Sequence, residues 1–227
     1  MSARPLPLAG WSRFNAVLLL LATLVALGAH DTGPYVIAGL LSFVVLLVSC
    51  RGGYTPKGVF GVGNAVTALR WLIASGVGLV PDSVPTWGLG GVVLGVFALD
   101  GVDGWVAKKR GETSAFGAHF DMETDGYFVL LLGIELFTRG RYGLWILGVG
   151  LLRYVYVLAL AVFPARRGDI PRFRFGRHAF TGLMLGLTLG MVLGEPLGTV
   201  ATLLGCGLVT AAFVHSFYWS YSAPPRA

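Results

Sequence analysis

Long apolar segments separated by short polar breaks recur along the whole chain and constrain its fold more than any other feature. Eight such segments occur, at 14–29, 35–50, 64–80, 86–107, 119–138, 142–163, 178–194 and 197–219. A helix needs about 17 to 25 mostly apolar residues to span a bilayer. Glycine or proline, the strongest turn signals, marks the breaks between the segments. The pattern predicts an all-α, polytopic membrane bundle of eight helices.

Composition excludes a water-soluble domain. Hydrophobic residues make up 55% of the 227 residues and charged residues only 12%, whereas about 25% of the residues of soluble domains are charged. A chain this apolar cannot cover a water-facing surface. The 34 glycines follow no Gly-X-Y period, which excludes a collagen-like chain.

Basic residues gather on one set of breaks. With eight crossings, one side of the membrane holds both termini and the breaks at 51–57, 108–110 and 166–177. That side collects fourteen of the 17 Lys and Arg residues, and the other side holds Arg139 and Arg141. Because positive loops stay in the cytoplasm, we expect an integral protein of the bacterial inner membrane with both termini cytoplasmic.

Four aspartates occupy the two segments that flank the break at 108–110. Asp100 and Asp103 are spaced i, i+3, and Asp121 and Asp125 are spaced i, i+4, so each pair lies on one helix face. On adjacent antiparallel helices the pairs converge at the cytoplasmic end, where carboxylates need positive charge between them to stay ionised. Oxygen ligands favour two Mg²⁺ or Mn²⁺ ions over zinc. An alternative is aspartates paired with the basic residues 108–110.

This segment resembles the signature of the CDP-alcohol phosphotransferases, D-x2-D-G-x2-A-R-x8-G-x3-D-x3-D. Every gap matches, and the fixed positions fall on Asp100, Asp103, Gly104, Ala107, Lys108, Gly117, Asp121 and Asp125. The one departure is Lys108, where the family has Arg. The charge is kept, but the planar fork that grips a phosphate with two hydrogen bonds is lost.

A shorter similarity lies upstream, where Asn64, Thr67 and Arg70 resemble the N-x2-T-x2-R that opens the first core helix of the family. An alternative is a helix capped by Asn64, with Arg70 snorkelling at the interface.

The resemblance implies a six-helix catalytic core at 59–227, preceded by a helical hairpin and linker at 1–58 with no assigned chemistry. Such an enzyme transfers a substituted phosphoryl group, here a phosphatidyl group from a donor such as CDP-diacylglycerol, to the hydroxyl of a small polar acceptor and releases CMP. The reaction belongs to phospholipid biosynthesis. The resemblance further implies a homodimer among membrane lipids, and no nucleic acid is expected as a partner.

The resemblance also assigns roles to individual residues. Asp100, Asp103 and Asp121 would ligate the metals, and Asp125 would be both a ligand and the general base. Contacts to the CDP donor are implied for Asn64, Thr67, Arg70, Gly104, Ala107, Lys108, Ser114 and Gly117.

The acceptor side is indicated by basic residues. Arginines cluster at 166–177, and Arg153 lies within an apolar segment. Arg153 and Arg177 are assigned to an anionic acceptor such as glycerol 3-phosphate or inositol phosphate, because Arg suits phosphate recognition. For the cluster at 166–177, attraction to anionic lipid headgroups is an equal alternative.

Two other functions are alternatives for a membrane chain with clustered aspartates. An aspartate-rich membrane prenyltransferase would carry N-D-x2-D-x3-D on one helix and a second, distant aspartate cluster. A transporter would distribute its charges across the membrane depth, often with repeat symmetry. Both fit less well, because the aspartates here divide between two adjacent segments and gather at one end.

Three further expectations concern residues near these motifs. Glu123 lies two residues from Asp121 and from Asp125 and should face away from the metals. His119 and Glu135 should pack or form a local ion pair rather than bind metal. Glycines at every fourth position from 182 to 198 form a stripe on the seventh helix, for intramolecular packing or, less favoured, a dimer interface.

Overall fold

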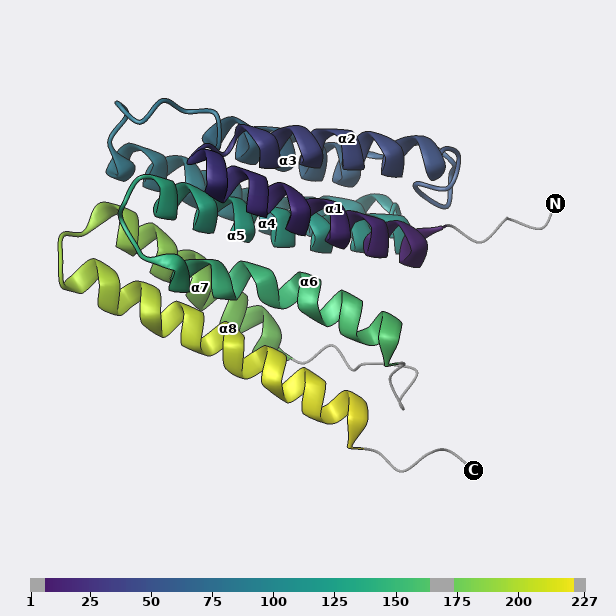
Figure 1. Ribbon diagram of the computed structural model, residues 1–227. Coiled ribbons are helices and arrows are strands. Elements are labelled where there is room, and N and C mark those ends of the chain that lie inside the picture. Colours follow the sequence, from purple (N-terminus) through teal and green to yellow (C-terminus); the bar gives the residue numbers. More distant parts are fainter. Residues whose placement is uncertain (1–6, 164–173, 223–227) are drawn as a thin grey trace. The chain divides into compact units, whose positions relative to one another are not determined.

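A computed structural model describes residues 7–163 and 174–222, and within these residues the chain is entirely helical (Figure 1). The helices, in chain order, are α1 (Leu8–Ala29), α2 (Gly33–Ser49), α3 (Val62–Val77), α4 (Thr86–Arg110), α5 (Ala115–Thr138), the short 3-10 helix η1 (Leu144–Ile146), α6 (Leu147–Val162), α7 (Arg174–Val192) and α8 (Leu197–Tyr221). Each of the eight predicted segments is a helix, which confirms the all-α prediction.

Several helices extend beyond the apolar segments that predicted them. The first helix is longer than the apolar segment 14–29 predicts, because it begins at Leu8 rather than at residue 14. α5 begins at Ala115 because Ser114 caps it: the Ser114 hydroxyl accepts a hydrogen bond of 2.9 Å from the Gly117 N–H. α4 continues through three basic residues, which the helix dipole favours in a last turn, and the chain then turns at Gly111 with a φ of +64°.

Within the described residues, four helices are long and apolar enough to cross a membrane by length and composition: α1, α4, the segment Leu144–Val162 and α8. α2 is apolar but shorter. α5 has 24 residues and carries the acidic residues of the aspartate segment. The protein is therefore an integral membrane protein. Its division into a six-helix core and two additional N-terminal helices remains a prediction.

The chain divides into two compact units. The first comprises Met1–Val80 and Val96–Gly150, and the second comprises Pro81–Gly95 and Leu151–Ala227. In the first unit α1 contacts α2, and α5 contacts α1, α2 and α3. Aromatic rings fill its core, among them the stacked pair Phe43 and Trp71 at 4.8 Å and the stacked pair Tyr35 and Tyr127 at 5.1 Å. The predicted division at residues 58–59 remains a prediction.

In the second unit, glycines let α7 and α8 approach closely. A Cβ at Gly186 would lie 2.5 Å from the carbonyl oxygen of Ala201, and a Cβ at Gly205 would lie 2.8 Å from that of Gly182. At Gly182 and Gly186 the predicted stripe therefore serves intramolecular packing. The predicted extent of the stripe was wrong, because α7 ends at Val192 and residues 194 and 198 lie beyond it.

Candidate active site

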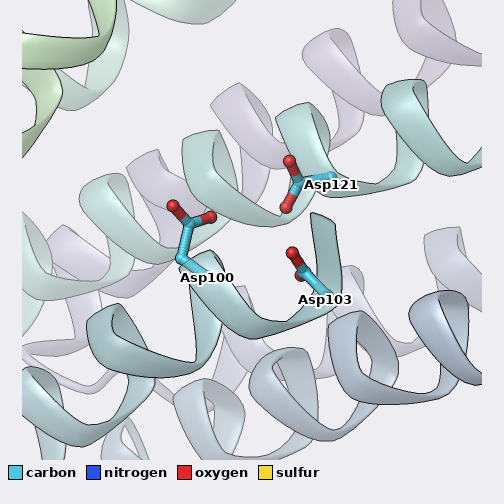
Figure 2. A group of neighbouring side chains, drawn as sticks. All are labelled: Asp100, Asp103 and Asp121. Carbon is cyan, nitrogen blue, oxygen red and sulfur yellow. The ribbon is translucent and has the colours of Figure 1, made fainter. Parts of the chain in front are cut away.

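The aspartates of α4 and α5 face one another, as their spacing predicts. Figure 2 shows the carboxylates of Asp100 and Asp103, from the last turns of α4, turned toward Asp121 near the start of α5. One oxygen atom from each of these three residues lies within 4.8 Å of the others. The side chains of Asp100 and Asp121 are 28% and 38% exposed, whereas that of Asp103 is 6% exposed. The cluster is thus open to solvent on one side.

Arg70 of α3 contacts all four aspartates of the segment. Its Nη atoms lie 2.8 Å from the nearest oxygen atoms of Asp100 and Asp103. They lie 2.6 Å from an oxygen of Asp121 and 2.7 Å from an oxygen of Asp125. The Arg70 side chain is only 2% exposed. These five groups carry a formal charge of −3, since four carboxylates face one guanidinium.

Such a donor set fits hard divalent cations. All its ligand atoms are carboxylate oxygens, which Mg²⁺ and Mn²⁺ prefer, and the excess negative charge of the cluster favours cation binding. Asp103 is oriented by neighbours as well as by charge, because the Thr67 hydroxyl donates to it at 3.0 Å. Asp100, Asp103 and Asp121 therefore form a possible metal site.

The basic residues at the end of α4 lie elsewhere. The Lys109 ammonium lies over the ring of Trp105 at 4.8 Å, and Arg110 pairs with Glu112 at 3.3 Å. Lys108 is exposed. Among the described residues, Arg70 and not residues 108–110 forms the ion pairs with the aspartates. The alternative in which residues 108–110 neutralise the aspartates is therefore wrong.

Asn64 and Ser114 both bind the segment that precedes α3. The Asn64 amide donates to the carbonyl groups of Phe60 at 2.6 Å and Tyr54 at 3.3 Å. The Ser114 hydroxyl donates to the same Tyr54 carbonyl at 2.6 Å. Gly61, not Asn64, is the N-cap of α3, and Arg70 is buried. The alternative of a capping Asn64 with a snorkelling Arg70 is therefore wrong.

The small residues of the signature divide into two groups. Gly104 is exposed, and a Cβ built on it would meet no atom within 4 Å. By contrast, a Cβ at Gly117 would lie 2.8 Å from the Asn64 Oδ1, and a Cβ at Gly63 would lie 2.9 Å from the Cβ of Ala107. Ala107 and Gly117 thus permit close helix packing around the site, while Gly104 leaves open space beside Asp103. Their donor contacts remain predictions.

Glu112, a site residue that was not predicted from the sequence, links the α4–α5 loop to α3. Its carboxylate accepts hydrogen bonds from the N–H of Val62 at 2.7 Å and of Gly63 at 3.5 Å. Desolvation acts to raise the pKa of Glu112, but these N–H groups and Arg110 outweigh it and hold the pKa below its ordinary value of 4.5. The sequence does carry one signal for this contact, because Glu112 is an acidic residue shortly after the basic residues 108–110.

Glu123 and Glu135 lie away from the aspartate cluster, as predicted. Glu123 contacts Ser12 and Asn15 of α1. Glu135 forms an ion pair of 2.5 Å with Arg139, which also donates to the Val80 carbonyl at 3.0 Å. The prediction of a local ion pair for Glu135 is confirmed.

His119 does not join the three-aspartate group and packs beside α1, as predicted. Its Nε2 lies 2.8 Å from the Ser12 hydroxyl, and its ring lies against Trp11 with 5.9 Å between the ring centroids. The sequence offered no signal for the α1 partners, because they lie about 110 residues upstream.

The predicted acceptor residues belong to the second unit. Arg153 is half-buried within α6, and Arg177 is exposed in the first turn of α7. Arg166, Arg167 and Arg172 of the predicted basic cluster lie outside the described residues. The acceptor assignments therefore remain predictions.

A sequence model of one family, CDP-alcohol phosphatidyltransferase, matches residues 60–214. No curated protein and no solved structure matches the chain. The matched region contains all four aspartates and Arg70 and leaves α1 and α2 outside it. The match sets aside the prenyltransferase and transporter alternatives. The chain belongs to the CDP-alcohol phosphatidyltransferase family, membrane transferases of phospholipid synthesis that move a phosphatidyl group from a CDP-alcohol.

Proposed function

We propose that this protein transfers the phosphatidyl group of CDP-diacylglycerol to the hydroxyl of a small, anionic acceptor and releases CMP. The observation that carries the proposal is the convergence of four aspartates from two helix ends on Arg70, beside the open backbone at Gly104 and the exposed Lys108. A lipid donor can present its diphosphate at such a helix end while its acyl chains stay in the bilayer.

Asp100, Asp103, Asp121 and Asp125 would hold the two divalent cations. Bound there, Mg²⁺ or Mn²⁺ would neutralise the donor diphosphate and stabilise the charge that develops during displacement at phosphorus.

The protein's own groups then have separate tasks. Asp125, whose side chain is 21% exposed, accepts the proton of the acceptor hydroxyl as general base. Thr67 and Arg70 hold Asp103 in place through hydrogen bonds of 3.0 Å and 2.8 Å. Lys108 offers a positive charge to the donor phosphates, and Gly104 lets the nucleotide approach the backbone closely.

The test is CMP release from CDP-diacylglycerol by the purified full-length protein. Asp121→Asn should abolish turnover without loss of folded protein, and chelation should reproduce the loss in the wild type. Asp31→Asn makes the same change at an exposed aspartate in another loop and should leave activity intact. Full activity of the wild type in excess chelator would contradict the metal-dependent function.

The acceptor is proposed to carry a phosphate, because Arg153 and Arg177 suit a phosphorylated alcohol. A panel of glycerol 3-phosphate, inositol phosphate, inositol and serine tests this. A phosphorylated acceptor should react fastest, and Arg153→Ala should raise its KM at least about tenfold, the effect of losing a charged hydrogen bond of about 1.5–3 kcal/mol. Arg141→Ala is the matched control. Preference for inositol, with kinetics that Arg153→Ala leaves unchanged, would contradict an anionic acceptor.

We also propose that the enzyme is a homodimer of the bacterial inner membrane, with its active site and both termini in the cytoplasm. The excess of basic residues on one set of breaks supports this orientation. We retain a hairpin and linker at 1–58 and a catalytic core at 59–227 as the proposed domains.

A further inference from the structure

Glu123 is a carboxylate buried between α5 and α1. It is 1% exposed. Its two oxygen atoms accept hydrogen bonds from two side chains of α1: Oε1 from the Ser12 hydroxyl at 2.9 Å, and Oε2 from the Asn15 amide at 3.2 Å. We call these three residues the α1 clasp. Because both oxygens are engaged, the clasp restrains the rotation of α5 as well as its distance from α1.

The clasp is supported by α2. The Ser42 hydroxyl of α2 donates to the Asn15 Oδ1 at 2.7 Å, which orients the Asn15 amide group toward Glu123. The Trp11 indole in turn donates to the Ser42 carbonyl at 2.9 Å. Asn15 and Ser42 are both 0% exposed. The α1–α2 hairpin therefore presents a prearranged set of donors to α5.

The clasp and the aspartate cluster lie on opposite faces of α5. Successive residues of an α-helix are about 100° apart around its axis, so Glu123 lies about 160–200° from Asp121 and from Asp125. On one face those two aspartates contact Arg70, and on the other face Glu123 contacts α1. A rotation of α5 that breaks the clasp would therefore also turn both aspartates away from Arg70 and from α4.

We propose that α1 positions the metal ligand Asp121 and the general base Asp125 of α5 through the clasp, an inference that rests on the proposed function. Glu123 is a positioning residue, since it acts through Asp121 and Asp125. The family match begins at residue 60, so the donors of the clasp come from outside the matched region. This gives the first two helices a task in the active site.

The test compares Mn²⁺ binding and kinetics in purified full-length variants. Asn15→Leu removes the amide that donates to the buried Glu123 Oε2 and so weakens the clasp. It should raise the dissociation constant of Mn²⁺, measured by electron paramagnetic resonance, by about tenfold, the lower end of the range for losing a group that orients metal ligands, because the clasp acts on the ligands only through the helix. It should lower kcat while leaving the KM for the CDP donor within about threefold.

Two comparisons separate positioning from mere stability. Thr23→Val is the matched control, because Thr23 is a buried hydroxyl of α1, 3% exposed, that donates to Leu19 within the same helix. It should leave Mn²⁺ binding unchanged. Glu123→Gln keeps an acceptor oxygen on the same stem and should bind Mn²⁺ more tightly than Glu123→Leu. The double variant Asn15→Leu/Glu123→Leu should be no worse than Glu123→Leu, because both act through one contact.

Each outcome decides the inference. If Asn15→Leu lowers the melting temperature but binds Mn²⁺ like the wild type, α1 only stabilises the fold and the inference is wrong. If Asn15→Leu yields no folded protein, Ser12→Ala and Glu123→Gln decide by the same criterion. Wild-type protein that binds Mn²⁺ but releases no CMP contradicts the proposed function alone. Wild-type protein that binds no Mn²⁺ contradicts both.

Discussion

Arg70 shows why the side-chain type matters at the centre of the aspartate cluster. A guanidinium carries five N–H donors in a planar fork and stays charged in every protein environment. From α3 it reaches carboxylates on both α4 and α5 at 2.6–2.8 Å. A lysine ammonium offers three donors from a single nitrogen and cannot make this set of contacts. Arg70 therefore joins three helices through one side chain.

Replacing Arg70 tests how the metal-free protein tolerates its carboxylates. Arg70→Met should destabilise the metal-free protein by about 3–5 kcal/mol, the usual effect of removing one partner from a buried ion pair. Added Mg²⁺ should raise the melting temperature of the variant more than that of the wild type, because the cation replaces the missing positive charge. The measurement is thermal unfolding with chelator and with Mg²⁺. An equal melting temperature for the two proteins in chelator would contradict this role of Arg70.

Lys108 occupies the one position at which the chain departs from the family signature. If Lys108 binds the donor phosphates, Lys108→Ala should raise the KM for the CDP donor about tenfold or more, as expected for a charged hydrogen bond. Lys108→Arg should be tolerated, since it restores the planar fork. Lys109→Ala is the control, because Lys109 lies over Trp105. A donor KM that is unchanged in Lys108→Ala but raised in Lys109→Ala would move the role to Lys109.

At the scale of helices, Glu112 connects the loop after α4 to the start of α3. The first N–H groups of a helix have no partner inside it, and the helix dipole favours a negative charge there. Glu112 meets both needs through Val62 and Gly63. The contact holds the loop between the two aspartate helices against α3, the helix that carries Arg70.

The Glu112 contact predicts a defined pH dependence of stability. The pKa of Glu112 is lower in the folded protein than its ordinary value of 4.5, so its stabilising effect is fully present above that value and is lost as the pH falls through the folded pKa. The melting temperature of wild type should exceed that of Glu112→Gln by a constant margin at neutral and mildly acidic pH. That margin should shrink below about pH 4.5. A margin that does not change with pH would contradict an ionised cap.

The ends of helices were the least predictable feature of the elements. Apolar segments predicted α4 to residue 107 and α5 from residue 119, whereas the helices include Arg110 and Ala115. Hydropathy reports which residues suit lipid, but a helix continues for as long as its backbone hydrogen bonds and its cap allow. The Ser114 cap and the turn at Gly111 set these ends, and neither depends on hydropathy.

At the scale of the molecule, the helical fold and the convergence of the aspartates could be predicted from the sequence. Both follow from periodicity within one or two neighbouring segments, as for Asp103 and Asp121. The partners of Arg70 and Glu123 could not be predicted, because they lie 30 to 111 residues away and depend on which helices pack together. Long-range packing leaves no local pattern, so buried polar pairs between distant helices became visible only in the structure.

The orientation of the molecule is tested by labelling single cysteines. Asp31→Cys and Thr113→Cys place exposed thiols in two breaks that are predicted to lie on opposite sides of the membrane, in a background with Cys50 and Cys206 replaced by alanine. In intact cells a membrane-impermeant maleimide should label position 31, and position 113 only after permeabilisation, because the basic breaks are expected in the cytoplasm. Labelling of position 113 in intact cells would reverse the topology.

The order of the clasp residues along the chain has a consequence for how the protein is made. Synthesis proceeds from the N-terminus, so Ser12 and Asn15 are in the membrane well before Glu123 leaves the ribosome. α5 carries four acidic residues, and charged side chains are costly wherever a helix enters a bilayer. We therefore expect the hairpin of α1 and α2 to form first and to offer Glu123 of α5 its hydrogen-bond donors when that helix is inserted. A chain that lacks α1 should therefore insert α5 into the membrane poorly, and this defect would precede any loss of catalysis.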